Sequence, residues 1–261
     1  MDGPLMKKLS ILFIANSFAD DTIQYMPEIA SDFDYDLDLY NLFIGGCPIN
    51  THIHNIIYNE KAYELRVYNK EKREWETVLD VSSVDFIKTR RWDYIVLQQA
   101  SYYSGLPNGL ENIERLVELV KGLANPDVKF AWLMTWAYPK YSDLEVFHKE
   151  YRNNQEFMYQ SIINNVKEKI VPNKDFVKII PSGTAIQNAR KYVDERLLHR
   201  DGFHLGYQFG RFLSGLTATA KLLDVDITKE KYHPEEVPEE VRQIFIKCVN
   251  DALNNPFEET K

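Results

Sequence analysis

The stretch LSILFIANSF, residues 9–18, decides how the rest of the chain is interpreted. Residues 9–15 are almost all apolar, but the run is far shorter than the roughly 20 residues that a membrane-spanning helix needs. A short, continuous apolar run is typical of a parallel strand that is covered on both faces. The run ends at Asn16-Ser17, where the sequence favours a helix start. The stretch therefore predicts a buried first strand that leads directly into a helix.

Further strand-like and helix-like segments alternate along the chain. The strand-like ones are YDLDLYNLFIGG (35–46), WDYIVLQ (92–98), VKFAWLMTW (128–136) and FVKIIPS (176–182). Periodic apolar stripes predict helices over 107–126, 143–172, 207–223 and about 235–252. Two β-rich runs around a polar turn at 62–81 predict an inserted hairpin. This alternation predicts a doubly wound α/β domain with a central, mostly parallel five-stranded sheet.

Composition limits the classes of function. The 261 residues fit a single domain over 1–261, and a formal net charge of −8 argues against binding nucleic acid or anionic membranes. The densest basic run, KEKR (70–73), is flanked by acids. Two lysines before the first apolar run superficially resemble a signal peptide, but no cleavage pattern follows. Met6 is a candidate natural start, with MDGPL upstream of it. We expect a soluble cytoplasmic protein with no membrane span, or a secreted or periplasmic one if a signal was removed.

The cysteines and nearby histidines give no metal or disulfide pattern. Cys47 and Cys248 are the two cysteines, and they form no CxxC pair. Cys47, His52 and His54 lie close in sequence, but their spacing matches no known zinc finger. We therefore expect no metal and no cofactor. The sequence leaves the oligomeric state open.

Polar residues and glycines follow three of the predicted strands. Ser17 follows the first strand, Gly45-Gly46 the second, and Gln98-Gln99 the third. In open α/β sheets, ligand sites form at the carboxyl ends of the strands. Each residue also has a structural explanation: Ser17 as a helix N-cap, the glycines as a turn, and the glutamines as amides that close the sheet edge. None of the three positions is decisive alone.

The stretch LHRDGFHLGYQFGRF, residues 198–212, places Asp201 three residues before His204. An acid at this spacing can accept a hydrogen bond from Nδ1–H of the histidine and leave Nε2 free to take a proton from a serine. The D-x-x-H pattern also arises by chance, or as an ordinary helix entry. The order of serine, glycine, amide and D-x-x-H along the chain is more informative than any one of them.

In that order the sequence resembles the SGNH (GDSL-type) hydrolases, and in particular a bacterial branch of uncharacterised SGNH-like proteins. The shared motifs are I-x-N-S-F, NL-x-IGGC, WDYIVLQQAS, MTWAY, IIPSGTAIQNAR and RDG-x-HL, from about Leu9 to Val225. The resemblance implies a three-layer α/β/α, flavodoxin-like sandwich. It also implies that Ser17 is a nucleophile, His204 its general base and Asp201 the orienting acid.

The same resemblance implies an oxyanion hole, with two departures from the wider superfamily. Gly46 matches the family glycine best, with Gly45 close behind, and its N–H is expected to act with that of Ser17. The usual G-D-S opening is Ala15-Asn16-Ser17. The usual third-block asparagine is replaced by Gln99, or by Gln98 if the register is shifted, and the glutamine amide can still donate.

Aromatic residues near these motifs complete the prediction. Tyr102, Trp136 and Tyr138 are expected to line a substrate pocket, although core packing explains aromatics equally well. The sequence predicts a serine esterase that acts on a small acyl ester, such as an O-acetylated carbohydrate. The alternatives are a catalytically degenerate carbohydrate-binding protein on the same fold, and an acyltransferase that uses the same acyl-enzyme.

Overall fold

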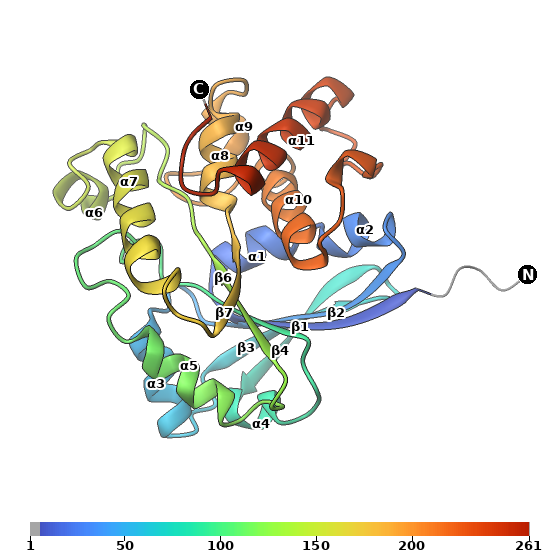
Figure 1. Cartoon of the computed structure of the whole chain (residues 1–261), viewed down its shortest axis with the longest axis vertical. Coiled ribbons are helices and arrows are strands. Elements are labelled where there is room, and N and C mark those ends of the chain that lie inside the picture. The colour runs from blue at the N-terminus through green and yellow to red at the C-terminus, as the bar shows by residue number, and fades with distance from the viewer. Residues whose placement is uncertain (1–5, 261) are drawn as a thin grey trace, which may run out of the picture.

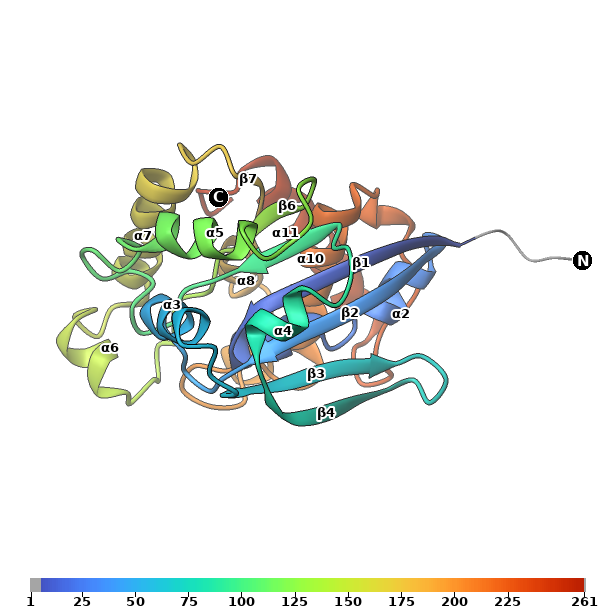
Figure 2. The same cartoon turned by 90° about the horizontal axis from the view of Figure 1, so that it is seen from below.

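A computed structural model of the chain describes residues 6–260, and the segment MDGPL considered above lies outside the described residues. The described chain forms a mixed sheet with the strand order β4-β3-β2-β1-β5-β6-β7 (Figures 1 and 2). Its parallel strands are the predicted ones: β1 (Lys7–Ala15), β2 (Tyr35–Phe43), β5 (Tyr94–Leu97), β6 (Lys129–Leu133) and β7 (Phe176–Ile180). The predicted α/β fold class is confirmed.

The predicted hairpin is also present, and it extends the sheet. Strands β3 (Tyr63–Asn69) and β4 (Glu74–Val81) pair antiparallel, and β3 pairs antiparallel with the outer edge of β2. The sheet therefore has seven strands rather than five. An edge strand presents unpaired N–H and C=O groups, so the hairpin gives β2 a partner on its open side. Figure 2 shows this pair beside β2.

Helices cover both faces of the sheet (Figure 1). One face carries a group of helices comprising α1 (Ser17–Ile23), α2 (Met26–Ser31), α8 (Ser182–Ala189), α9 (Glu195–Leu198), α10 (Phe209–Leu223) and α11 (Glu239–Asn254). The other face carries α3 (Ile49–Ile57), α4 (Ser83–Ile87) and α5 (Ile113–Lys121). Within residues 6–260, no helix is long and apolar enough to cross a membrane.

One long helix was predicted over 143–172, and this prediction is wrong. The segment forms α6 (Glu145–Lys149), then α7 (Gln155–Asn165), which continues as a π-helical turn (Val166–Ile170). Arg152 and Asn153 have φ of 57° and 49°, which a right-handed helix does not allow. Asn154 then caps α7 by accepting a hydrogen bond from the Phe157 N–H.

The core explains why the first strand is apolar without interruption. Side chains of β1 alternate between two buried clusters, with Ile11 and Phe13 on one face and Leu12 and Ile14 on the other. These four residues are completely buried. Each inward-facing apolar side chain contributes about 1.5–3 kcal/mol by its removal from water. A polar residue at any of these positions would face a helix layer rather than solvent.

Parallel pairing brings the three polar strand ends to one edge of the sheet. Ala15 pairs with Phe43, and Ile14 pairs with Leu97. The loops that begin at Asn16, Ile44 and Gln98 therefore leave the sheet side by side.

Candidate active site

Ser17 is the first residue of α1, yet it does not cap that helix. Asn16 is the N-cap: its backbone is extended, and its Oδ1 accepts a hydrogen bond from the Phe18 N–H at 3.0 Å. The capping alternative for Ser17 is therefore wrong, because the preceding residue meets that need. The Ser17 hydroxyl is left for another contact, and its Oγ lies 2.9 Å from Nε2 of His204.

Asp201 orients His204 from the other side of the ring. Its Oδ2 lies 2.8 Å from Nδ1 of His204, while its Oδ1 accepts the backbone N–H groups of Phe203 and His204 at 2.9 and 2.7 Å. Burial alone would raise the pKa of Asp201, but these hydrogen bonds outweigh it and hold the pKa below its ordinary value. An ionised Asp201 can only accept, which assigns the proton to Nδ1 and leaves Nε2 to accept from Ser17.

Gly46 lies beside Ser17 on the wall of the same pocket. Its φ is +62°, a conformation that glycine adopts without steric cost. Among the hydrogen bonds of residues 6–260, neither the Ser17 N–H nor the Gly46 N–H has an acceptor. Gly45 also lines the pocket. Two residues of the pocket lining therefore carry backbone N–H groups without an acceptor in the described chain.

Gln99, expected as a side-chain donor to this space, is directed elsewhere. Its Oε1 accepts the N–H groups of Ile49 and Ala100 at 3.1 and 2.7 Å, and its Nε2 donates to the carbonyl of Gly109. Gln99 is not among the residues that line the pocket. The amide holds α3 and the loop after β5 together, so the geometry does not support an oxyanion role.

Gln98 does not reach the pocket either, but it acts on a residue that does. Its Nε2 donates to Oδ1 of Asn16 at 2.7 Å. Oδ1 of Asn16 thus accepts from both Gln98 and Phe18, so its Nδ2 is directed away from these donors. Asn16 lines the pocket, and within the described chain no acceptor meets this Nδ2. Sequence reasoning missed Asn16, although its place before a predicted helix was a signal for capping.

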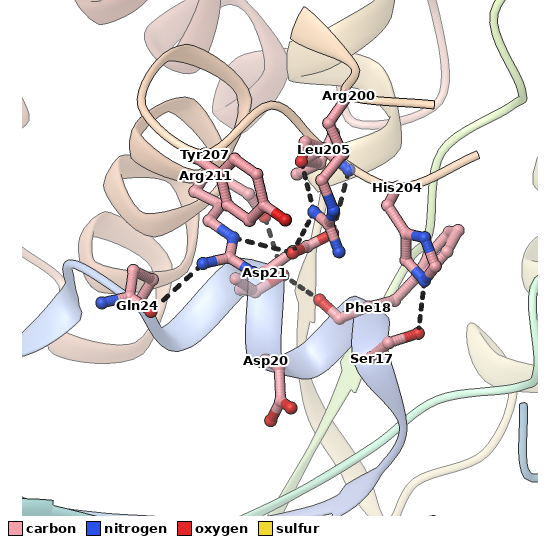
Figure 3. Close-up of polar contacts among 12 residues, drawn as sticks. Ser17, Phe18, Asp20, Asp21, Gln24, Arg200, His204, Leu205, Tyr207 and Arg211 are labelled. Atoms are coloured by element: carbon pink, nitrogen blue, oxygen red, sulfur yellow. Dashed lines mark hydrogen bonds and ion pairs between the residues drawn. The ribbon is translucent and has the colours of Figure 1, made fainter. Parts of the chain in front are cut away.

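A buried carboxylate joins α1 to the loop over 199–208, which carries His204 and is called the histidine loop (Figure 3). Asp21, on α1, is completely buried. Its Oδ2 accepts the N–H of Leu205, the residue after His204, at 2.9 Å. Its Oδ1 accepts from Arg200 at 2.7 Å and from Arg211 of α10 at 2.8 Å.

We call Asp21, Arg200 and Arg211 the carboxylate clamp. Arg200 lies one residue before Asp201, and it also donates to the carbonyl of Leu205. Both guanidinium groups lie over the ring of Tyr207, with centroid distances of 4.9 and 4.8 Å. The clamp fixes the backbone on both sides of His204 relative to α1, and hence relative to Ser17. The sequence gives no sign of it, because its partners are separated by 179 and 190 positions.

The space in front of Ser17 and His204 is a cavity of about 730 Å³. The predicted Tyr102 and Tyr138 line it. Trp136 does not line the cavity, because it is completely buried. Its ring stacks on that of Phe18 with a centroid distance of 4.2 Å, and its Nε1–H donates to the carbonyl of Phe203. It therefore supports the wall from behind. The apolar lining that sequence reasoning missed is Phe18, Phe43, Leu144, Val146 and Phe203.

The Cys47 and His52 side chains form a buried contact behind the glycine loop. The Cys47 Sγ lies 3.7 Å from Nδ1 of His52, which also meets the Tyr63 hydroxyl at 2.8 Å. Complete burial lowers the pKa of His52 to about 4, so the ring is neutral, and its Nδ1 shares a hydrogen bond with the Tyr63 hydroxyl. His54 is exposed on the other side of α3. In the part of the chain that the structure describes, no three His, Cys, Asp or Glu side chains gather as metal ligands.

Comparison with solved structures defines the class of the fold. The chain is similar to a candidate SGNH hydrolase from Slackia heliotrinireducens, with 15% sequence identity over 83% of this chain and 100% of the other, and a TM-score of 0.50. At this identity the likeness concerns the fold. The protein is therefore an α/β protein with an SGNH-hydrolase-like fold, as the sequence resemblance implied.

A comparison with family models assigns the chain to a family within this class of fold. The chain belongs to the DUF4886 family, a domain of unknown function, whose family model matches residues 10–252. A DUF4886 family protein from Bacteroides uniformis ATCC 8492 is 31% identical, with a TM-score of 0.91 over 97% of this chain and 98% of the other. No curated protein sequence matches the chain.

Proposed function

We propose that this protein is a serine hydrolase that cleaves ester bonds through an acyl-enzyme on Ser17. The observation that carries the proposal is the continuous chain of contacts from Ser17 Oγ to His204 Nε2 at 2.9 Å and from His204 Nδ1 to Asp201 at 2.8 Å. The first distance lies within the range that proton transfer between a nucleophile and its base requires, and the second is that of a hydrogen bond that orients the base. The SGNH-like fold supports the same class of reaction.

The contacts define how acylation would proceed. Ser17 Oγ attacks the ester carbonyl while its proton passes to Nε2 of His204. The carboxylate of Asp201 stabilises the imidazolium that forms. The developing oxyanion is placed near the N–H groups of Ser17 and Gly46, with Nδ2 of Asn16 as a third donor in place of the glutamine expected from the sequence.

The second half of the reaction uses the same groups. The tetrahedral intermediate collapses, the C–O bond to the alcohol breaks, and His204 gives its proton to the leaving oxygen. A water molecule then loses a proton to Nε2 of His204 and attacks the acyl carbon. The bond from the acyl carbon to Ser17 Oγ breaks, the acid leaves, and His204 returns the proton to Oγ, which restores both residues. An O-acetylated carbohydrate as the ester remains a prediction from the sequence alone.

Hydrolysis of p-nitrophenyl acetate and labelling by a fluorophosphonate test the proposal. We expect Ser17→Ala to lose both hydrolysis and labelling, with a fall in kcat of at least about 10³-fold. Ser31→Ala, the same substitution on an exposed residue of α2, should keep both. A purely carbohydrate-binding protein would show neither reaction in the wild type. Equal activity of wild type and Ser17→Ala would exclude the triad assignment.

A further inference from the structure

Part of the wall of the pocket beside Ser17 consists of side chains that cannot form a hydrogen bond with a sugar. The aliphatic and phenyl side chains of its lining come from four separate places in the chain, namely Phe18 of α1, Phe43 at the end of β2, Leu144 and Val146 around the start of α6, and Phe203 in the histidine loop. These surfaces offer dispersion contacts and no donors or acceptors. A cavity of about 730 Å³ is within the usual range for a site that encloses a small organic ligand.

Both tyrosine hydroxyls of the lining are hydrogen-bonded within the protein. The Tyr138 hydroxyl lies 2.8 Å from Oγ of Ser101, which is the other serine of the lining besides Ser17. The Tyr102 hydroxyl donates to the carbonyl of Gly46 at 3.0 Å. Both rings therefore present their carbon faces to the cavity while their polar ends are held by the protein.

The remaining polar groups lie at the reaction centre or point to solvent. Ser17 and His204 are paired with each other, and Asn16 has only its Nδ2 without a partner. Glu145 is the one acidic side chain of the lining; it is 77% exposed and paired with Lys149. Recognition of a sugar ring needs several polar side chains aimed at its hydroxyls, because each buried hydroxyl without a partner costs free energy.

The aromatic wall is also held rigidly. The Phe18 ring lies between the rings of Trp136 and Phe203, with centroid distances of 4.2 and 6.4 Å. The Phe203 ring in turn packs against the rings of Tyr138 and His204, with centroid distances of 6.1 and 3.8 Å. A wall that is already ordered binds an apolar group without the entropic cost of ordering side chains.

We propose that this cavity binds an apolar group of the ester, aromatic or aliphatic with several carbons, and that the substrate is such an ester rather than an acetylated sugar. The inference rests on the proposed function, because it assigns the substrate class of the same site. The apolar group can belong to the acyl part or to the alcohol part of the ester. Either source presents the same chemistry to Phe43, Leu144 and Val146.

Two ester series distinguish the sources. One varies the acyl chain of p-nitrophenyl esters from acetate to butyrate and hexanoate, and adds benzoate. The other varies the alcohol of acetates from ethyl to hexyl and benzyl. Each methylene that becomes buried should raise kcat/KM by about fourfold, so the two added by butyrate give roughly 15-fold over acetate. A rise along either series supports the proposal and names the part that the cavity holds.

Variants of the lining link the preference to this cavity. Leu144→Ala should lower the ratio of kcat/KM for the preferred long ester to that for its short counterpart by about fivefold or more. Leu79→Ala is the matched control, because Leu79 lies on β4 with 63% exposure and should leave the ratio unchanged. The wild-type series does not depend on whether Leu144→Ala folds.

The outcomes separate this inference from the proposed function. If a fluorophosphonate labels Ser17 but both series are flat, and an acetylated methyl xyloside is cleaved with the highest kcat/KM, the apolar assignment is overturned while the hydrolase stands. If Ser17 is not labelled and no ester is cleaved, the proposed function itself fails. An unchanged ratio in Leu144→Ala would also count against this cavity as the site of the preference.

Discussion

Replacement of Asp21 by asparagine tests whether the carboxylate clamp positions the catalytic residues. Asp21 is completely buried and accepts from two arginines and from the Leu205 N–H. Asparagine keeps one acceptor oxygen, so the Leu205 contact can survive. It removes the negative charge, however, and then turns an NH₂ group toward both guanidinium groups.

The structure gives the size of the expected loss. Removing one partner of a fully buried ion pair costs about 3–5 kcal/mol. The Arg200 and Arg211 side chains retain 20% and 18% exposure and can regain part of their hydration. We therefore expect Asp21→Asn to lower the free energy of unfolding by about 2–4 kcal/mol, which corresponds to a fall in Tm of roughly 5–12 °C.

The catalytic effect should exceed what lost stability explains. With the histidine loop no longer fixed to α1, the contact between Ser17 and His204 is held less well. A displacement of about 1 Å at a reacting group can cost about 10²-fold in rate. Well below the Tm of the variant, we expect kcat to fall by about 10–100-fold with a smaller change in KM. The rate of fluorophosphonate labelling, which reports on serine activation, should fall in parallel.

Leu116→Ala supplies the matched control. Leu116 is completely buried on α5, across the sheet from the clamp, and its truncation should cost a similar 2–5 kcal/mol (Figure 1). Activity and labelling of this variant should stay near wild type at the same temperature. If Asp21→Asn loses as much stability as Leu116→Ala but keeps the full kcat and labelling rate, the clamp stabilises the fold without positioning the site.

Two further predictions concern Asn16 and His52. Asn16→Asp keeps the capping oxygen but removes the Nδ2 donor. The kcat for p-nitrophenyl acetate should therefore fall by about 10²–10³-fold with little change in Tm. A kcat within threefold of wild type would exclude Asn16 as a third oxyanion donor. Because burial lowers the pKa of His52 to about 4, the unfolded state takes up its proton at higher pH than the folded state. Urea denaturation should therefore show the free energy of unfolding falling as the pH drops from about 6.5 to 4, with about 3 kcal/mol from His52. His52→Asn, which keeps a polar side chain beside Tyr63, should flatten this slope. His54→Asn, on the exposed side of the same helix, should not. Equal slopes in the wild type and both variants would show that His52 is not the group responsible.

Much of the fold follows from local patterns in the sequence. The continuous apolar runs predicted the parallel strands because a strand covered on both faces has no polar side. The hairpin at 62–81 followed from its β-rich runs around a polar turn. The helix over 143–172 was predicted as continuous because the apolar spacing persists across Arg152 and Asn153, and periodicity does not detect a local left-handed backbone.

The candidate site also has residues that the sequence predicts and residues that it does not. Ser17, Gly46, Asp201 and His204 were each visible in the sequence, because they sit at strand ends or within a short local motif. Which amide faces the pocket was not visible, since it depends on where each side chain finds its partners. Gln99 is held by Ile49 and Ala100, and Gln98 by Asn16, so neither lines the cavity.

The sequence by itself indicated the class of fold and the strand ends at which the candidate site lies, and its resemblance to SGNH hydrolases singled out Ser17, His204 and Asp201. Each of these depends on short-range spacing or on hydrophobic periodicity, which a linear chain records. Only the tertiary structure decided that Asn16 caps the helix and frees Ser17, that Asp21 joins α1 to the histidine loop, and that Trp136 lies behind the pocket wall. Those outcomes depend on contacts between residues far apart in the chain, which compete for the same few polar partners in a close-packed interior.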